Sequence, residues 1–347
     1  MGSGNDADAP PAELRRHVHY WNGLDEVPAD LGPTAVTIGN FDGVHLGHQE
    51  VLTQLAAAAA EHEASAVAVS FDPHPAQVHR PHQCPEMITG VQERIYRLAT
   101  TGIDAMLMIR YSLDLAALTP AEFVKQYFVD ALNVRVVVVG HDVRFGRGNT
   151  GSFETMVELG EQYGFAVVGV EDFGRDRRCS STWVREALAA GDVASAREVL
   201  GRPHAVLGEV VHGAARGREL GFPTANLGQD SEGMIPADGV YAGWLTDGHG
   251  RRWPAAISVG SNPTFDGVQR VVESFVIGRP KEKVEDFDLY GQQVRVEFID
   301  RLRGMVAFEG IPQLISQMEE DVARAKLTLG TDDPEHLDAR PVPAVEG

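Results

Sequence analysis

The fold is indicated by one stretch near the N-terminus, residues 34–48, which reads TAVTIGNFDGVHLGH. Its first residues, Thr34–Ile38, are mostly β-branched and predict a buried strand, whereas the following Gln49–Glu61 has the pattern of a helix. Between them lie three glycines, which let the backbone approach a ligand because they have no Cβ. The stretch therefore predicts a strand, a glycine-rich turn and a helix N-terminus, which together can bind a phosphate group.

Two histidines, His45 and His48, stand three residues apart at this turn. This spacing places two side chains on the same side of a helix, so both imidazoles can converge on one group. There they can stabilise charge that develops on a phosphoryl group during its transfer. The alternative is a pair of polar histidines that only cap the helix.

The pattern around this turn repeats along the first half of the chain. We expect further strands at Ala66–Phe71, Ala105–Ile109, Val134–Val139 and Phe165–Val170. Helices are expected between them, at Val91–Thr100, Ala121–Leu132 and Ser152–Gln162. Such alternation is typical of βαβ units with a mostly parallel sheet, in which ligands bind at the carboxyl ends of the strands.

The second half of the chain has a different pattern. Two short helices are expected at Thr182–Ala190 and Val193–Leu200, ended by Gly201-Arg202-Pro203. Strand patterns follow at Ala205–Val211, Val240–Leu245, Ala255–Val259, Val271–Ile277 and Val294–Ile299, and a helix at Ile311–Leu327. These predict a small antiparallel β-barrel with a C-terminal helix. The expected organisation is a disordered leader (1–16), an α/β domain (17–186), a helical linker (187–203), a barrel domain (204–330) and a disordered tail (331–347).

The overall charge of −20 over 347 residues argues against polymeric nucleic acid and anionic membranes as partners. Basic residues gather locally, however, at residues 174–185 and 202–218, which suits small nucleotides. No apolar stretch is long enough to span a bilayer, and no basic segment joined to an apolar region opens the chain. Because the two cysteines, Cys84 and Cys179, cannot form a disulfide framework, we expect a cytoplasmic protein.

One further group of residues has the chemistry of metal ligands. It comprises His74, His79, His82 and Cys84. Their spacing matches no standard zinc pattern, and two prolines stiffen the segment. Zinc is therefore the weaker interpretation.

Four separated segments in order resemble the HxGH nucleotidylyltransferases, and within them the adenylyltransferase half of the bifunctional bacterial riboflavin kinase/FAD synthetase family. The segments are Gly39–His48, Phe71–Pro75, Gly140–Gly146 and Ser180–Arg185. The resemblance implies an α/β nucleotidylyltransferase domain with a Rossmann-like parallel sheet. It also implies that His45 and His48 act at the phosphates of ATP, and that FMN attacks the α-phosphorus to give FAD and pyrophosphate.

The same resemblance implies two sets of binding residues. Nucleotide and phosphate groups would be bound by Gly39, Phe41, Asp42, Gly43 and Gly47, and by a second clamp of Ser180, Ser181 and Arg185. The clamp is also favoured by physics, since two serines open a predicted helix and the arginine follows one turn later. Flavin would be bound by His74, Pro75, Asp142 and Phe145.

A second candidate site lies where the first barrel strand enters a glycine-rich loop, residues 210–227. Thr224 and Asn226 are two residues apart on an extended segment, so their side chains face the same side. A threonine hydroxyl is a hard oxygen ligand that suits Mg²⁺. An ordinary barrel loop with a Pro-Thr turn is the alternative.

This loop resembles the Pro-Thr-Ala-Asn signature of the riboflavin kinases. Downstream segments agree with it: Gly239–Tyr241, Ser258–Phe265, Val272–Ser274, Asp288–Gly291 and Val294–Phe298. The resemblance implies that Glu273 is the general base, that Thr224 and Asn226 hold Mg²⁺, and that nucleotide binding involves Gly213, Arg216, Gly221, Pro223 and Asn226. Residues 278–288 depart from the family pattern, so the loop over the flavin is expected to differ.

The two resemblances together imply a bifunctional enzyme that phosphorylates riboflavin to FMN in the barrel and adenylylates FMN to FAD in the α/β domain. Its partners would be riboflavin, FMN and ATP with Mg²⁺. Two alternatives stay open: an enzyme with only one of the activities, and a flavin-binding regulatory or storage protein. The sequence also leaves open whether the chain forms a homo-oligomer.

Overall fold

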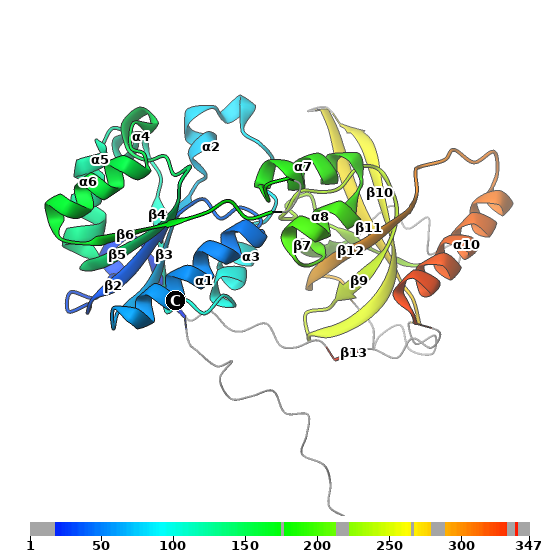
Figure 1. Cartoon of the computed structure of the whole chain (residues 1–347). Coiled ribbons are helices and arrows are strands. Elements are labelled where there is room, and N and C mark those ends of the chain that lie inside the picture. The colour runs from blue at the N-terminus through cyan, green and yellow to red at the C-terminus, as the bar shows by residue number, and fades with distance from the viewer. Residues whose placement is uncertain are drawn as a thin grey trace, which may run out of the picture.

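The computed structural model describes residues 18–174, 177–212, 222–264, 267–278, 289–331 and 337–338. Two lobes lie side by side, and helices α7 (Ser181–Ala190) and α8 (Val193–Leu200) stand between them (Figure 1). The predicted leader lies outside the described residues. Within the predicted tail the structure describes Thr331 and the short strand β13 (Leu337–Asp338), which pairs with the barrel.

The first lobe contains a six-stranded sheet in the order β1-β4-β3-β2-β5-β6, in which every pairing is parallel. Its strands are β1 (His19–Asn22), β2 (Thr34–Ile38), β3 (Ser65–Asp72), β4 (Ala105–Arg110), β5 (Val134–Gly140) and β6 (Ala166–Val170). Strand order reverses between β2 and β5, so their carboxyl ends leave a crevice at the point where ligands bind in such sheets. The edge strand β1 was not predicted from the sequence.

Helices cover both faces of this sheet (Figure 1). One face packs on α1 (Leu46–Glu61) and α3 (Val91–Ala99), and the other on α5 (Pro120–Phe123), η4 (Val124–Ala131) and α6 (Phe153–Tyr163). Shorter elements lie in the connections: η2 (Leu24–Glu26), α2 (Pro75–His79), η3 (Pro81–Gln83), α4 (Leu113–Ala116) and η5 (Arg147–Asn149). Strand β5 is buried on both faces, because its residues Val136–Val139 are at most 1% exposed. This continuous apolar run is typical of a central parallel strand.

The second lobe is an antiparallel barrel. Its strands follow the order β11-β8-β7-β12-β9-β10, and a β10–β11 pairing closes the ring. They are β7 (His204–Val211), β8 (Thr224–Leu227), β9 (Gly239–Thr246), β10 (Arg251–Thr264), β11 (Gly267–Val276) and β12 (Gln293–Arg303). The C-terminal helix α10 (Ile311–Leu329) packs on the outside of the barrel. The predicted fold class is thus confirmed in both lobes.

The helices between the lobes share a core with the barrel. Val184, Leu188, Val199 and Leu200 are at most 1% exposed and belong to the same apolar cluster as the barrel interior. Ile88 of the first lobe is fully buried in that cluster too. The two lobes therefore meet across a continuous apolar contact, and α7 and α8 lie within it.

Candidate active sites

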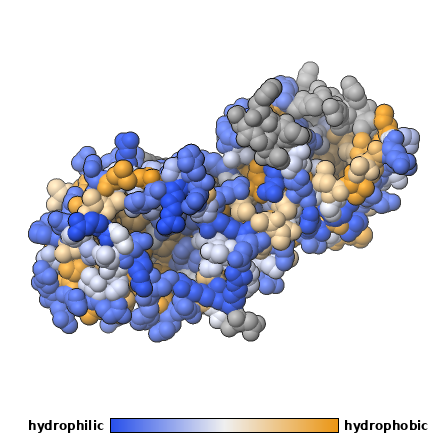
Figure 2. Space-filling model, turned by 90° about the horizontal axis from the view of Figure 1, so that it is seen from above, coloured by the Kyte–Doolittle hydropathy of each residue, from blue (hydrophilic) through white to orange (hydrophobic). Residues whose placement is uncertain are grey.

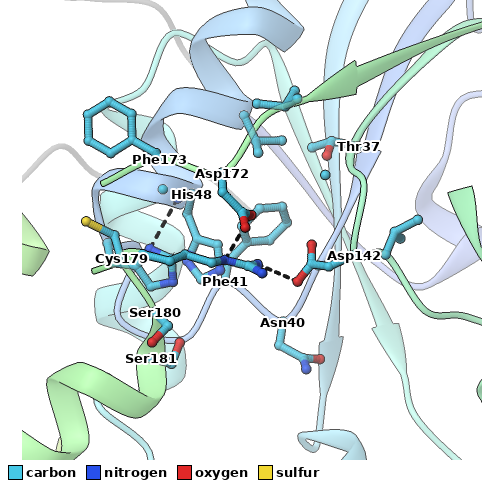
Figure 3. A pocket seen from close by; sticks show the side chains of 18 of the residues that line it. Thr37, Asn40, Phe41, His48, Asp142, Asp172, Phe173, Cys179, Ser180 and Ser181 are labelled. Atoms are coloured by element: carbon cyan, nitrogen blue, oxygen red, sulfur yellow. Dashed lines mark hydrogen bonds and ion pairs between the residues drawn. The ribbon is translucent and has the colours of Figure 1, made fainter. Parts of the chain in front are cut away.

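A cavity of about 370 Å³ opens at the carboxyl ends of β2 and β5. Figure 2 views this end of the molecule from above and shows a hollow in the first lobe with hydrophilic side chains around it. Residues from three connections line the cavity (Figure 3), namely β2 to α1, the loop after β5, and β6 to α7; among them are Gly39, Phe41, His45, Gly47, His48, Asp142, Arg178, Ser180 and Ser181. Most residues predicted to bind nucleotide are therefore brought to one place.

The two histidines stack at the start of α1. The His45 and His48 rings lie 3.7 Å apart between centroids and 20° from parallel. His45 also caps the helix, because its Nδ1 accepts a hydrogen bond from the backbone N–H of His48 at 3.3 Å. The neutral His45 ring therefore carries its proton on Nε2. Among the described residues, the buried Nδ1 of His48 has no hydrogen-bond partner, while the His48 side chain lines the cavity.

Both imidazoles are uncharged at neutral pH. Burial, with a smaller contribution from Arg178, lowers the pKa of His45 to about 4. Burial and the neighbouring His45 hold the pKa of His48 well below its usual value. The pair therefore offers neutral imidazole groups to an incoming phosphate, and the positive charge of the cavity comes from arginine.

Neutral buried histidines make stability depend on pH. His45 and His204 have pKa values of about 4 in the folded chain, against 6.5 for an unperturbed histidine. We therefore expect the free energy of unfolding to rise as pH increases from about 4 to 6.5, and to level off above pH 6.5. In this range the unfolded chain binds protons that the folded chain does not, which favours unfolding as pH falls. His204 is buried, and its Nε2 lies 2.6 Å from the carbonyl oxygen of Met234. His204→Gln should reduce the slope near pH 5 by about 1 kcal/mol per pH unit, measured by urea unfolding.

The matched control is His62→Gln, at the exposed C-terminal end of α1. This variant should keep the slope of the parent chain. An unchanged slope in His204→Gln would contradict the assignment of a neutral, buried His204.

Three predicted phosphate-binding residues lie behind the cavity wall. Asp42 is 2% exposed, accepts hydrogen bonds from the backbone N–H groups of Ile88 and Thr89, and forms an ion pair with Arg185. Arg185 also donates to the carbonyl oxygen of Glu86 at 2.8 Å. Gly43 shares this position, since its amide faces Thr89. In this structure Asp42, Gly43 and Arg185 support the turn from behind.

Removing the cation from this buried pair should destabilise the protein strongly. Arg185→Met is expected to lower the free energy of unfolding by about 3 kcal/mol, because the Asp42 carboxylate stays buried without its counter-ion. The double variant Asp42→Asn/Arg185→Met removes the charge as well and should lose less. Urea unfolding of both variants measures this, and equal losses would show that the pairing contributes little.

Each serine of the predicted clamp makes a backbone contact. Ser180 caps α7 by accepting a hydrogen bond from the backbone N–H of Trp183 at 3.2 Å. Ser181 donates to the carbonyl oxygen of Asp42 at 2.8 Å, which fixes the N-terminus of α7 against the histidine turn. Both serines line the cavity, so this helix N-terminus faces the space where a phosphate would lie.

Arg178 is the residue that sequence reasoning missed. It lines the cavity and forms ion pairs with Asp142 and Asp172, whose carboxylates are directed into the cavity (Figure 3). The signal was the basic stretch 174–185, but the motif that we quoted begins two residues later, at Ser180. Asp142, predicted to contact flavin, forms an ion pair with this arginine in the structure.

A second cavity of about 300 Å³ adjoins the first. The two share the wall residues Ile38, Gly39, Asn40, Val143 and Arg144. The second cavity is rich in aromatic side chains, with Phe71, Tyr111, Phe123 and Phe145, and includes Pro75. Of the remaining predicted flavin residues, His74 caps α2 through a hydrogen bond from the Ala76 amide at 3.1 Å. A polar cavity thus adjoins an aromatic cavity that suits a planar ring.

The candidate site in the barrel lies where β8 pairs with β11. Glu273 is directly opposite Asn226 in the register. The Asn226 amide nitrogen donates to the carbonyl oxygen of Thr224 at 3.2 Å and approaches its hydroxyl at 3.4 Å, so both side chains face the same side as expected. Thr224 and Glu273 line a cavity of about 240 Å³ that α10 and residues 305–308 help to enclose. Glu273 is thereby brought to the Thr224–Asn226 pair, although it lies far from that pair in the sequence.

Several predicted residues of this second site lie outside the described residues: Gly213, Arg216, Gly221 and the loop 279–288. Pro223 immediately precedes β8. Within the described ranges, no group of three His, Cys, Asp or Glu residues is placed to hold a metal ion. In the same part of the chain, every helix is too short or too polar to traverse a bilayer.

Comparison with known proteins gives the same division of the chain. A family model described as FAD synthetase matches residues 27–183, and one described as riboflavin kinase matches residues 200–329. The bifunctional riboflavin kinase/FMN adenylyltransferase of Escherichia coli (strain K12) is 33% identical over 323 residues, which is 93% of this chain and 99% of that protein. The protein of the same name from Pseudomonas fluorescens is 35% identical and covers 88% of this chain and 96% of its own length.

A solved structure agrees with the fold. A Streptococcus pneumoniae crystal structure, described as that of a macrolide-efflux protein, superposes with a TM-score of 0.78 at 30% identity and covers 89% of this chain and 99% of its own. The match spans both lobes, so their arrangement recurs in an experimental structure. With a candidate site in each lobe, and with relatives of one name that match over nearly their whole length, the chain belongs to the family of bifunctional riboflavin kinase/FMN adenylyltransferases.

Proposed function

We propose that this chain converts riboflavin to FMN in its barrel and FMN to FAD in its α/β domain, using ATP in both reactions. The observation that carries this is the presence of two separate sites, one in each domain: the adjoining polar and aromatic cavities of the α/β domain and the single cavity of the barrel. Each combines phosphate-binding groups with an apolar wall. A storage protein that holds one flavin has no use for both.

In the α/β domain we assign ATP to the polar cavity and the flavin ring of FMN to the aromatic one. Because the two cavities share a wall, the FMN phosphate would then lie beside the α-phosphate of ATP. An FMN phosphate oxygen attacks the α-phosphorus, the bond to the β-phosphate oxygen breaks, and pyrophosphate leaves. His45 and His48 donate N–H groups to the phosphate oxygens as charge shifts, and Arg178 supplies a positive charge.

Arg185 can bind a phosphate directly only if its side chain moves. In the structure its guanidinium is held by Asp42 and Glu86, so direct contact with a phosphate requires it to leave these partners. Arg178 already lies in the cavity. We therefore assign the direct contact with the phosphate to Arg178, and to Ser180 and Ser181 at the helix N-terminus.

In the barrel we assign Glu273 as general base. Its carboxylate takes the proton of the ribityl 5′-hydroxyl while that oxygen attacks the γ-phosphorus of ATP, and ADP leaves. A positioned base contributes roughly 10² to 10⁴ in rate. The apolar side chains of Val306, Phe308 and Met318 line the same cavity and suit the flavin ring.

The oxygen groups on β8 fit Mg²⁺. The Asn226 amide nitrogen faces Thr224, which leaves the amide oxygen, together with the Thr224 hydroxyl, as hard ligands. Mg²⁺ binds through few protein ligands and completes its shell with waters and phosphate oxygens. When bound, the ion would neutralise charge on the phosphates of ATP.

The free thiols Cys84 and Cys179 agree with the cytoplasmic location that we propose.

Incubation with riboflavin, ATP and Mg²⁺, followed by chromatographic separation of the flavins, tests this function. FMN should appear first and FAD second, as FMN accumulates. FMN without FAD would leave a kinase only, FAD formed only from added FMN would leave an adenylyltransferase only, and unchanged riboflavin would favour a binding protein.

A further inference from the structure

The turn that carries the histidines has an unusual backbone. Phe41 and Val44 have positive φ angles of 49° and 39°, although neither is glycine, and Gly43 has a φ of 81°. A β-branched residue such as Val44 is seldom found in this region, because its Cβ crowds the backbone. Such conformations persist only where the surroundings hold them in place.

The surroundings hold this turn by its carbonyl groups. The Asn40 oxygen accepts from Arg94 at 3.1 Å, and the Asp42 oxygen accepts from Ser181 at 2.8 Å. The next two carbonyl groups, those of Gly43 and Val44, are held from the other side. Both accept hydrogen bonds from Arg202, at 2.7 Å through Nη2 and at 3.1 Å through Nη1.

Arg202 comes from the other half of the chain. It follows α8, stands two residues before the first barrel strand, and lies in the stretch that matches riboflavin kinase. The sequence had placed it in a basic region suited to a nucleotide at the second site. Its guanidinium instead reaches back to the turn, and its Nη1 also donates to the carbonyl oxygen of Leu200 at 3.2 Å.

The contact of Arg202 with the turn lies next to His45 and His48. Val44 is adjacent to His45, whose Nδ1 already receives the His48 amide. Gln49 reinforces the arrangement, since its amide nitrogen donates to the carbonyl oxygens of both Val44 and Leu200, at 2.9 and 3.0 Å. The orientation of both imidazoles therefore depends on a backbone that Arg202 fixes.

We propose that Arg202 is a positioning residue for adenylyl transfer, by which the kinase half of the chain holds the histidine turn of the other half in its reactive shape. This inference rests on the proposed adenylyltransferase role of His45 and His48. Arg202 lines none of the cavities that we assign to substrates. Its fork-shaped guanidinium binds two successive carbonyl groups at once, which a lysine ammonium cannot do with the same geometry.

The test compares Arg202→Met, Arg202→Lys and the control Arg295→Met in the full-length chain. Arg295 is a matched control because it also crosses between the lobes, from β12 to Glu93 on α3 at 2.7 Å, without touching the turn. For each variant, the kcat and KM of FAD formation from FMN, the rate of FMN formation from riboflavin and the melting temperature are measured. FMN formation reports in the same sample whether the chain is folded.

We expect Arg202→Met to lower kcat and kcat/KM of FAD formation equally, by roughly 10- to 100-fold, because displaced catalytic groups weaken only the transition state. FMN formation should stay within about twofold, since Arg202 does not line the barrel cavity. Arg202→Lys should show an intermediate kcat, and Arg295→Met should keep both activities. If Arg202→Met does not fold, the intermediate kcat of Arg202→Lys decides.

Two results would overturn the proposal. One is a full adenylyltransferase kcat in folded Arg202→Met, or in Arg202→Lys where the former does not fold. The other is a parallel loss of both activities, in Arg202→Met or in Arg295→Met, which indicates a general structural role. Failure of the proposed function itself is distinguishable, because the unaltered chain would then form no FAD.

Discussion

His48→Ala is expected to lower the rate of FAD formation from FMN by a factor of at least about 10², and to leave FMN formation from riboflavin unchanged. One well-placed hydrogen-bond donor to a developing oxyanion is worth roughly 10² to 10³ in kcat. His48 meets this description, because it lines the polar cavity and its ring stacks on that of His45. Separation of FMN and FAD by chromatography gives both rates from one preparation.

The control for this variant is His62→Ala, on the same helix at its exposed end. It should keep both rates. Unchanged FAD synthesis in His48→Ala would remove the histidine from the reaction, whereas loss of both activities would point to misfolding of the chain.

Glu273→Gln should have the opposite selectivity. The amide keeps the shape of the side chain but cannot accept the hydroxyl proton, so the rate of FMN formation should fall roughly 10²- to 10⁴-fold. FAD formation from added FMN should be retained, because that reaction uses the other cavity. The two rates are measured separately, with riboflavin or FMN as the only flavin supplied.

Glu209→Gln is a matched control, since Glu209 lies exposed on the barrel strand β7, which β8 separates from β11. It should leave both activities intact. A normal kinase rate in Glu273→Gln would exclude Glu273 as the base and leave the cavity without an assigned proton acceptor.

The sequence predicted the parallel sheet well because its strands are strongly apolar. The run Val136–Val139 has no helical periodicity that would compete with a strand. The predicted strand Val134–Val139 differs from β5 by one residue, at its C-terminal end. The edge strand β1 has the sequence HYWN, which is polar and aromatic and lacks a strand pattern. Strand β8 is only four residues long and forms its face by pairing with β11, a long-range contact that local sequence does not encode.

The candidate sites were predicted to the extent that they follow local geometry. The histidine turn and the Thr224–Asn226 pair depend on neighbouring residues, and their positions agree with the expected ones. Arginine roles depend on which partner a long side chain reaches across the fold. Arg178, Arg185 and Arg202 all lie in basic stretches of sequence, yet one lines the cavity, one pairs with buried Asp42, and one binds backbone carbonyl groups.

The wall that the polar and aromatic cavities share has a further consequence, for the end of the reaction cycle. On the assignment that we propose, FMN and ATP bind in one cavity each and can depart independently. FAD joins their two parts covalently, so it would span both cavities, and one half would stay bound when the other half dissociates. The adjoining cavities that bring the reactants together therefore also slow the dissociation of FAD. Release of FAD is then a step at which the overall rate of the reaction can be limited.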